Sequence, residues 1–316
     1  MSQHSAVSAD LAQLEQALRE TWEGDPDLAS GPMRDLMEAG GKRIRPTLLL
    51  LCSRLGVHDL TRVQPAALAI ELTHAATLVH DDVIDRSALR RGRPSVFASS
   101  GASDAILVGD YYFARAYREA SRTGLAVVVE TLAQSVMAIC EGELEQQAFR
   151  FAYGPTIERY LRRCELKTGR LMSAACSIGA DLGQMDRAGR EACAAYGLEL
   201  GIAFQIVDDV LDYQGDPLEL GKPAGHDLLE GSATLPLILA REDPEVSRML
   251  VDGQALDEVT VADVVRRVRD SGACERALEH ARAHAERASE HIRKVAASPA
   301  RAELEHVAAQ MLGRKY

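Results

Sequence analysis

The chain has 316 residues, of which 47% are apolar, 26% are charged and only 4% are aromatic. Its formal net charge of −11 argues against nucleic acid as a partner, because binding to a phosphate backbone normally needs a basic surface. The apolar content is ample for a core, and the scarcity of aromatic residues beside abundant Ala and Leu favours helices over sheets.

No apolar run reaches the roughly 18 residues that a membrane-spanning helix needs, and the first residues lack the apolar core of a secretory signal. We therefore expect a soluble, cytoplasmic protein. The six cysteines lie far apart without a CxxC pair, and all but Cys274 fall in helical, largely apolar surroundings, so we interpret them as reduced core thiols rather than disulfides or zinc ligands. They are Cys52, Cys140, Cys164, Cys176, Cys193 and Cys274.

Apolar residues recur at helical spacing along the whole chain, and no strand pattern of period two stands out. An apolar helix runs from Glu71 into an aspartate-rich end, and a glycine-rich loop follows residue 213. No linker rich in Pro or Ser interrupts the chain, so we expect one large all-α bundle that forms a single domain over residues 1–316. The other predicted helices cover residues 9–22, 29–39, 42–55, 101–120, 125–148, 155–180, 186–213, 233–241, 258–270, 272–296 and 299–312.

Gly40 and Gly41 end the second predicted helix, and they also free the backbone to approach a ligand. Lys42, Arg43 and Arg45 then crowd the start of the next helix. A solvated helix entrance would explain them, but the helix dipole disfavours cations at this end. A bound anion is the better interpretation.

Three aspartates end the helix that opens at Glu71. Asp81 and Asp85 are four positions apart, so they share one helix face, with Asp82 at its edge. A divalent cation would remove their mutual repulsion, and Mg²⁺ prefers carboxylate oxygens while keeping positions for phosphate. An arginine cluster suited to phosphate follows at residues 90, 91 and 93.

The same spacing of aspartates recurs at Asp208, Asp209 and Asp212, again near the end of an apolar helix. One DDxxD motif is a weak signal, because acidic proteins contain such motifs by chance. Two copies on separate apolar helices, each followed by basic residues, are hard to explain as surface decoration. If the two helices face each other, up to six carboxylates surround one cavity, where several Mg²⁺ ions could bridge one diphosphate.

At this point the sequence resembles the trans-isoprenyl (polyprenyl) diphosphate synthases. The resemblance implies a helical fold around a deep central cavity, usually dimeric, that condenses an allylic diphosphate, such as farnesyl or geranylgeranyl diphosphate, with isopentenyl diphosphate. The matching segments occur in the family's order: GGKRIRP at 40–46, HDDVIDRSALRRGRP at 80–94, GDYYFARA at 109–116, KTG at 167–169, FQIVDDVLD at 204–212 and GKPAGHDLLEG at 221–231.

The resemblance also implies roles for individual residues. Asp81, Asp85 and Asp208 would bind Mg²⁺ directly, with about three ions expected beside the diphosphate. Asp82, Asp209 and Asp212 would complete the metal site by orienting waters or ions. The allylic diphosphate would contact Arg90, Lys167 and Lys222. Thr168 and Gln205 would stabilise the nascent carbocation, and released pyrophosphate would take up the proton. The metal-free pocket for isopentenyl diphosphate would consist of Gly41, Lys42, Arg45, His74 and Arg91.

Two positions depart from the family pattern: Phe97 replaces a common His, and Ser232 replaces a common Lys. Product length should depend on the residues five and four positions before Asp81, which are Ala76 and Thr77. Neither is bulky, so we expect the product to grow to C30 or longer unless Tyr112, Phe113 or a lower side chain blocks the cavity. A short-chain synthase making C15 to C20 products is the alternative.

Other classes of function explain less of the sequence. Glu71 with His74 and Glu303 with His306 form two ExxH pairs, which could belong to a di-iron bundle, but both DDxxD motifs would then be unexplained. A non-catalytic subunit tends to lose these aspartates, and a terpene cyclase generally lacks the second motif.

Overall fold

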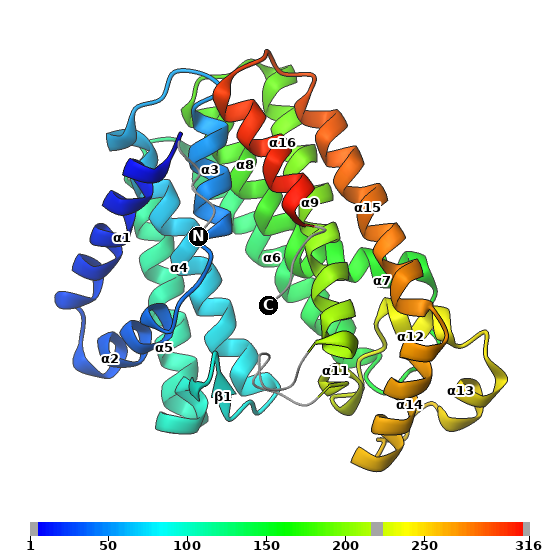
Figure 1. Ribbon diagram of the computed structural model, residues 1–316. Coiled ribbons are helices and arrows are strands. Elements are labelled where there is room, and N and C mark those ends of the chain that lie inside the picture. Colours follow the sequence, from blue (N-terminus) through cyan, green and yellow to red (C-terminus); the bar gives the residue numbers. More distant parts are fainter. Residues whose placement is uncertain (1–5, 216–223, 312–316) are drawn as a thin grey trace. The chain divides into compact units, whose positions relative to one another are not determined.

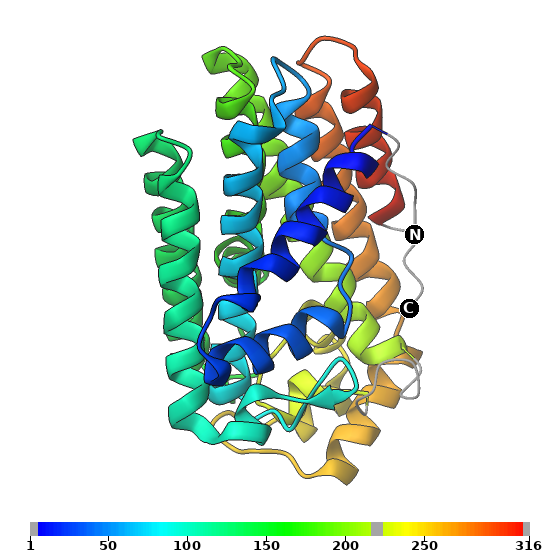
Figure 2. The ribbon, with the colours of Figure 1, turned by 90° about the vertical axis from the view of Figure 1, so that its left-hand side faces the viewer.

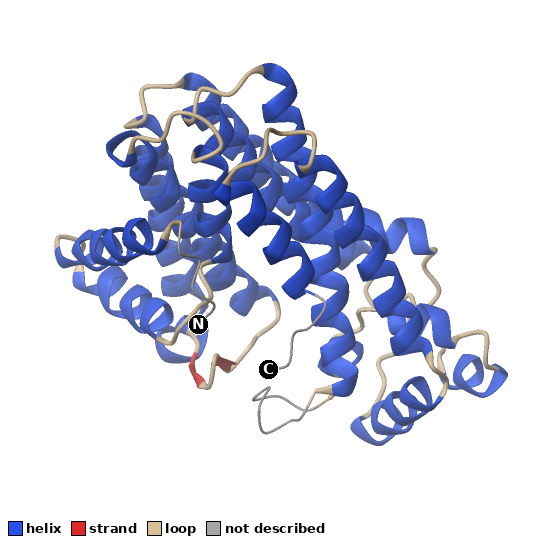
Figure 3. Ribbon diagram, turned by 45° about the horizontal axis from the view of Figure 1, so that its top comes forward, coloured by secondary structure: helices blue, strands red, loops and turns tan. Residues whose placement is uncertain are grey.

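The computed structural model describes residues 6–215 and 224–311. Every regular element in these ranges is helical except one short hairpin, drawn in red in Figure 3. The predicted all-α class is therefore confirmed. The hairpin pairs β1 (Leu89–Arg90) with β2 (Arg93–Pro94) antiparallel, and our prediction of no strands was wrong there because two-residue strands are too short to show alternation.

The chain divides into two compact units. Their helices are labelled in Figure 1. The first comprises Met1–Val136, Ala174–Ala194 and Arg293–Leu304, and the second comprises Met137–Ser173, Ala195–Ile292 and Glu305–Tyr316. Our expectation of a single domain stays a prediction. None of the helices in the described ranges is long and apolar enough to span a membrane.

The first unit is organised around α4 (Leu60–Ile84), which packs mainly against α5 (Val96–Ser121). α4 begins well before Glu71, because the Asp59 side chain caps it by accepting a hydrogen bond from the Thr61 amide at 3.0 Å. α4 carries buried residues on all of its faces rather than on one stripe, as expected of a buried helix. Figure 2 shows α1 (Ser8–Glu23) and α2 (Asp27–Glu38) lying across α4 and α3 (Ile44–Ser53).

The second unit has its own apolar core, centred on Tyr160, Tyr213 and Leu235. Helix α12 (Leu235–Ala240) packs against α15 (Ala273–Ile292), and α14 (Glu258–Asp270) contacts both. The predicted helix over 155–180 is divided into α7 (Ile157–Cys164), a π-helical turn η1 (Glu165–Gly169) and α8 (Arg170–Leu182). Sequence periodicity does not reveal this turn, because a single π-turn adds only one residue to the pattern.

The remaining helices lie close to their predicted ranges. Two short helices were not predicted, because each is too short to show periodicity: α11 (His226–Leu229) and α13 (Pro244–Met249). The helices not yet introduced are α6 (Ala126–Ala148), α9 (Arg187–Gln214) and α16 (Pro299–Met311).

The prediction of reduced core thiols is confirmed except at Cys140. All six thiols are free, and those of Cys52, Cys164, Cys176 and Cys193 are buried as expected. Cys140 is exposed on α6, so our placement of it in the core was wrong. Cys274, which we had set apart from the helical core, is buried on α15.

Candidate active site

The first aspartate motif occupies the last turn of α4. Asp85 is the C-terminal cap of the helix, and its amide donates to the Asp81 carbonyl at 2.8 Å. Asp81 and Asp85 are half-buried, one turn apart as predicted, whereas Asp82 is only 1% exposed. The three carboxylates therefore lie in two different environments.

The hairpin brings Arg90 back onto Asp82. Arg91 and Gly92 form its two-residue turn, with positive φ angles of 52° and 74°, which suit the right-handed twist of the paired strands. Arg90 donates from Nε at 2.9 Å and from Nη2 at 2.5 Å to Oδ1 of Asp82. Burial raises the pKa of Asp82, and the hydrogen bond and charge of Arg90 oppose that rise without cancelling it.

A cavity of about 200 Å³ lies beside this ion pair. Asp82, Arg90 and Arg93 form part of its wall, and α2 supplies Asp35 and Leu36 among other residues. The space is thus bounded by both charged and apolar groups of the first unit.

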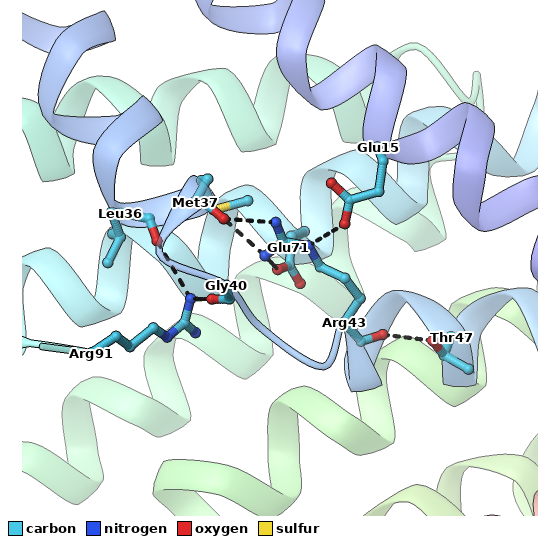
Figure 4. Close-up of polar contacts among 8 residues, drawn as sticks. All are labelled: Glu15, Leu36, Met37, Gly40, Arg43, Thr47, Glu71 and Arg91. Atoms are coloured by element: carbon cyan, nitrogen blue, oxygen red, sulfur yellow. Dashed lines mark hydrogen bonds and ion pairs between the residues drawn. The ribbon is translucent and has the colours of Figure 1, made fainter. Parts of the chain in front are cut away.

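Among the predicted acceptor residues, Arg91 contacts the segment that joins α2 to α3, as Figure 4 shows. Arg91 donates to the Gly40 carbonyl and, at 3.4 Å, to the Leu36 carbonyl. A Cβ atom on Gly41 would lie 3.2 Å from Nη1 of Arg91, so this position has little room for a side chain. Lys42 is exposed beside it.

His74 lies within the field of the same arginines. Its pKa is held well below the ordinary range, first by burial and then by the positive charges of Arg45, Arg91, Arg90 and Arg43. The imidazole is therefore neutral at physiological pH. Two of these arginines, Arg45 and Arg91, belong to the group of residues predicted to bind the acceptor with His74.

The second motif lies on α9, within the second unit. Asp208 is half-buried, whereas Asp209 and Asp212 are 4% and 2% exposed. Asp209 accepts from the Tyr160 hydroxyl at 2.7 Å and from Nε2 of Gln205 at 2.8 Å. Burial, followed by the charge of Asp227, raises the pKa of Asp209 to about 7. In both motifs, then, the second aspartate is buried and bonded to protein groups.

Asp212 binds the backbone of the residues that follow the undescribed segment 216–223. Its carboxylate accepts from the Asp227 amide at 3.2 Å, and its carbonyl accepts from the Gly225 amide at 2.9 Å. Lys222, predicted to contact the allylic diphosphate, lies outside the described residues. Ser232 is half-buried nearby, and its amide donates to the Asp227 carbonyl at 2.8 Å.

The π-turn η1 carries Lys167 and Thr168. The Thr168 hydroxyl donates to Oε1 of Gln205 at 2.6 Å, so Gln205 links Thr168 with Asp209. Lys167 donates to Oε1 of Gln146 at 3.0 Å and pairs with Glu143. Gly201 permits this packing, because a Cβ there would lie 2.6 Å from the Gly169 Cα atom.

The two small residues predicted to control product length are both buried. Ala76 is fully buried, and Thr77 is 9% exposed with its hydroxyl donating to the His74 carbonyl at 2.8 Å. The Tyr112 hydroxyl donates to Asp25 at 3.1 Å, whereas the Phe113 ring lies 5.5 Å from that of His80. The Tyr112 hydroxyl is therefore bonded to the loop between α1 and α2. Phe97 is half-buried on the first turn of α5.

Contacts of the two ExxH pairs argue against a di-iron site. Oε1 of Glu71 accepts from Nη1 of Arg43 at 2.8 Å, and Oε1 of Glu303 accepts from the Ala6 amide at 2.8 Å. Sequence reasoning missed Arg43 and Tyr160 as partners of acidic residues at the site. The presence of Glu71 in an otherwise apolar stretch could have indicated a basic partner, because a buried carboxylate requires one.

The carboxylate oxygens of the two aspartate motifs are the kind of ligand that Mg²⁺ prefers. Among the described residues, no three or more His, Cys, Asp or Glu side chains come close enough to hold a metal by themselves. Mg²⁺ usually binds through one or two carboxylates and completes its shell with water and substrate phosphate. The half-buried Asp81 and Asp85 fit that pattern.

Comparison with known proteins identifies the family. Residues 26–268 match the sequence model of the polyprenyl synthetase family. The chain is 38% identical over 274 residues to heptaprenyl diphosphate synthase component 2 of Geobacillus stearothermophilus, covering 86% of each chain. It is 36% identical over 288 residues to geranylgeranyl diphosphate synthase of Methanosarcina mazei, covering 90% of this chain and 89% of that one.

A solved structure agrees with these matches. The polyprenyl synthase from Caulobacter crescentus CB15, complexed with calcium and isoprenyl diphosphate, superposes with a TM-score of 0.93. It is 35% identical and covers 98% of this chain and 96% of its own. The resemblance read from the motifs is confirmed: the chain belongs to the polyprenyl synthetase family, the trans-isoprenyl diphosphate synthases.

Proposed function

We propose that this chain is a trans-prenyltransferase that condenses an allylic diphosphate, such as farnesyl or geranylgeranyl diphosphate, with isopentenyl diphosphate. The observation that carries the proposal is the arrangement at the end of α4, where Asp81 and Asp85 stand one turn apart beside the arginine-bearing hairpin. Such an arrangement offers carboxylates for a metal and guanidinium groups for a diphosphate.

Asp81 and Asp85 in the first motif and Asp208 in the second would hold Mg²⁺, with about three ions expected. When bound, magnesium neutralises the charge that develops on the diphosphate as it leaves. Arg90, Lys167 and Lys222 contact the same diphosphate. Asp82, Asp209 and Asp212 act within this site mainly by fixing groups around it, since each is buried and bonded to protein donors.

The acceptor isopentenyl diphosphate binds without metal at Gly41, Lys42, Arg45, His74 and Arg91. Its double bond attacks the allylic carbon after ionisation, and the released pyrophosphate removes the proton. The Thr168 hydroxyl points its hydrogen at Gln205, which leaves oxygen lone pairs to stabilise positive charge.

We further propose a product of C30 or longer, because Ala76 and Thr77 are small. The similarity to a heptaprenyl diphosphate synthase component supports this length. The similarity to a geranylgeranyl diphosphate synthase favours the second candidate, a C20 product. The enzyme would act in the cytoplasm as a homodimer, and each chain would form a single domain. Light scattering after gel filtration would test the oligomeric state.

The deciding experiment incubates the purified chain with Mg²⁺, labelled isopentenyl diphosphate and one primer, which is dimethylallyl, farnesyl or geranylgeranyl diphosphate. We expect chains of C30 or longer on mass spectrometry after removal of the diphosphate, and far less product from Asp81→Asn at the same Mg²⁺ concentration. A product that stops at C20 from farnesyl diphosphate, or at C15 or C20 from dimethylallyl diphosphate, would replace the long-chain proposal with the short-chain one. No elongation from any of these three primers, with folded protein and Mg²⁺ present, would refute the prenyltransferase proposal.

A further inference from the structure

The side chain of Arg43 is buried among acceptor groups, unlike that of its exposed neighbour Lys42. Its side chain is 10% exposed. Nε donates to Oε1 of Glu15 at 2.7 Å, Nη1 donates to Oε1 of Glu71 at 2.8 Å, and Nη2 donates to the Met37 carbonyl at 3.0 Å (Figure 4). All three guanidinium nitrogens are thus engaged within the first unit.

These partners belong to three different helices. Glu15 lies on α1, Met37 on the last turn of α2 and Glu71 on α4. The Arg43 carbonyl also accepts from the Thr47 amide at 3.0 Å and from the Thr47 hydroxyl at 2.7 Å, within α3. Arg43 therefore joins four helices at the point where the segment from Ala39 to Lys42 ends.

The backbone at Arg43 is strained. Its φ of 47° is in the left-handed region, which non-glycine residues rarely adopt unless the surroundings enforce it. The contacts of the guanidinium supply that enforcement. Because the strained residue directly follows Lys42 and lies two positions before Arg45, its conformation sets where both of these side chains leave the backbone.

Gly41 is held between two guanidinium groups. A Cβ atom there would lie 3.0 Å from Nη1 of Arg43 and 3.2 Å from Nη1 of Arg91. Arg91 in turn donates to the Gly40 carbonyl. The segment is consequently in contact with both Arg43 and Arg91.

The burial of Glu71 explains why position 43 requires a cationic side chain. Its carboxylate is only 4% exposed, so without a partner it would be a buried, uncompensated charge. Arg43 neutralises it, and the charge of Arg43 is also one of those that keep His74 neutral, one turn along α4. The pair therefore connects the α2–α3 segment to the helix that bears the first aspartate motif.

We infer that Arg43 is a positioning residue for the acceptor site: through Glu15, Glu71 and the Met37 carbonyl it holds Gly41, Lys42 and Arg45 in the arrangement that receives the diphosphate of isopentenyl diphosphate. Arg43 itself does not touch the substrate. This inference rests on the proposed function, since it deepens the role of the same site. It predicts a defect confined to the acceptor substrate.

The test compares Arg43→Gln with wild type by two measurements. Calorimetric titration of isopentenyl diphosphate in EDTA reports acceptor binding without turnover, and steady-state kinetics report KM for each substrate. We expect Arg43→Gln to weaken acceptor binding and raise its KM about tenfold or more, with KM for the allylic diphosphate within about twofold of wild type. Arg43→Lys, which keeps the charge but not the three-way contact, should restore only part of the affinity.

Arg54→Gln is the matched control. Arg54 also ties α3 to α1, because it donates from Nε at 3.0 Å and from Nη2 at 2.7 Å to Oδ2 of Asp10, but at the other end of α3. It should lower the melting temperature without changing KM for isopentenyl diphosphate. An equal rise in that KM for both variants would show that general loosening of α3 is responsible, and would overturn the inference.

The double change Arg43→Gln with Glu71→Gln removes the uncompensated carboxylate, so it keeps the test decisive if the single variant does not fold. A folded double variant with wild-type acceptor affinity would overturn the positioning role. If wild type binds the acceptor and forms product while Arg43→Gln binds equally tightly, only the role of Arg43 fails. If wild type neither binds the acceptor nor forms product, the proposed function fails with it.

Discussion

Arg90 donates two hydrogen bonds to one carboxylate oxygen of Asp82, from Nε at 2.9 Å and from Nη2 at 2.5 Å. Asp82 is 1% exposed, whereas its neighbour Asp81 is half-buried. The middle residue of the first DDxxD motif thus orients an arginine, and the flanking residues are the more accessible oxygen donors.

The first prediction separates the roles of Asp81 and Asp82. Asp81→Asn should raise the Mg²⁺ concentration needed for half-maximal activity. Asp82→Asn should leave that concentration unchanged but lower kcat/KM for the allylic diphosphate about tenfold or more, because a hydrogen bond to a charged group contributes about 1.5–3 kcal/mol. Magnesium titrations of both variants make the comparison, and an equal shift in Mg²⁺ requirement would show that Asp82 also binds metal.

The second prediction concerns product length. Ala76→Phe should shorten the product, since a bulky side chain would then stand five residues before Asp81 on α4. Because Ala76 is fully buried, the same change should also reduce the free energy of unfolding by about 1–3 kcal/mol. Thr77→Phe, starting from a 9% exposed residue, should shorten the product as well.

Mass spectrometry of the products and thermal melts separate these two effects. Ala12→Phe, on an exposed position of α1, is the control and should change neither product nor stability. An unchanged product from both folded α4 variants would place the floor of the elongation path elsewhere.

The third prediction tests the contact between α9 and η1. Gly201→Ala would bring a Cβ to 2.6 Å from the Gly169 Cα atom and 3.2 Å from the Thr168 carbonyl oxygen. The backbone must shift, so we expect a loss of about 1–3 kcal/mol in stability and a fall in kcat as Thr168 moves relative to Gln205. Gly31→Ala on α2 is the control, because no atom lies within 4 Å of its added Cβ.

Melting temperature and kcat should both fall for Gly201→Ala. In the helical Gly31 control, stability should rise slightly, by up to about 1 kcal/mol. Wild-type kcat for Gly201→Ala would show that the π-turn tolerates displacement without loss of its catalytic geometry.

The fourth prediction follows from the lowered pKa of His74. Burial and the neighbouring arginines keep the folded imidazole neutral, whereas in the unfolded chain His takes up a proton below about pH 6.5. The unfolded state then binds more protons, so His74 lowers stability progressively as the pH falls below that value. The melting temperature of His74→Gln relative to wild type should therefore be higher at pH 5.5 than at pH 8.

The kinetic counterpart concerns the acceptor substrate. Because burial and the neighbouring arginines hold the pKa of His74 well below its ordinary range, its protonation should not contribute to acceptor binding near neutral pH. KM for isopentenyl diphosphate should therefore follow the same pH profile in wild type and in His74→Gln. A selective loss of affinity in the variant at the acid end would mean that a protonated His74 contributes to diphosphate binding.

The sequence predicted much of the fold because helical periodicity and the DDxxD spacing are local properties. α1, α2 and α9 lie close to their predicted ranges, and Asp81 and Asp85 stand one turn apart as four-residue spacing requires. The short hairpin was missed, because two-residue strands carry no periodicity.

The sequence by itself thus determined the helical class, the two acidic motifs and the family. Only the tertiary structure decided which side chains those motifs contact: Asp82 with Arg90, Asp209 with Tyr160, and Glu71 with Arg43. Tyr160 and Asp209 are 49 residues apart in the chain, and Arg43 and Glu71 are 28 apart. Such pairs form because burying a charge or a polar group requires a partner, and packing, rather than local spacing, determines which partner is within reach.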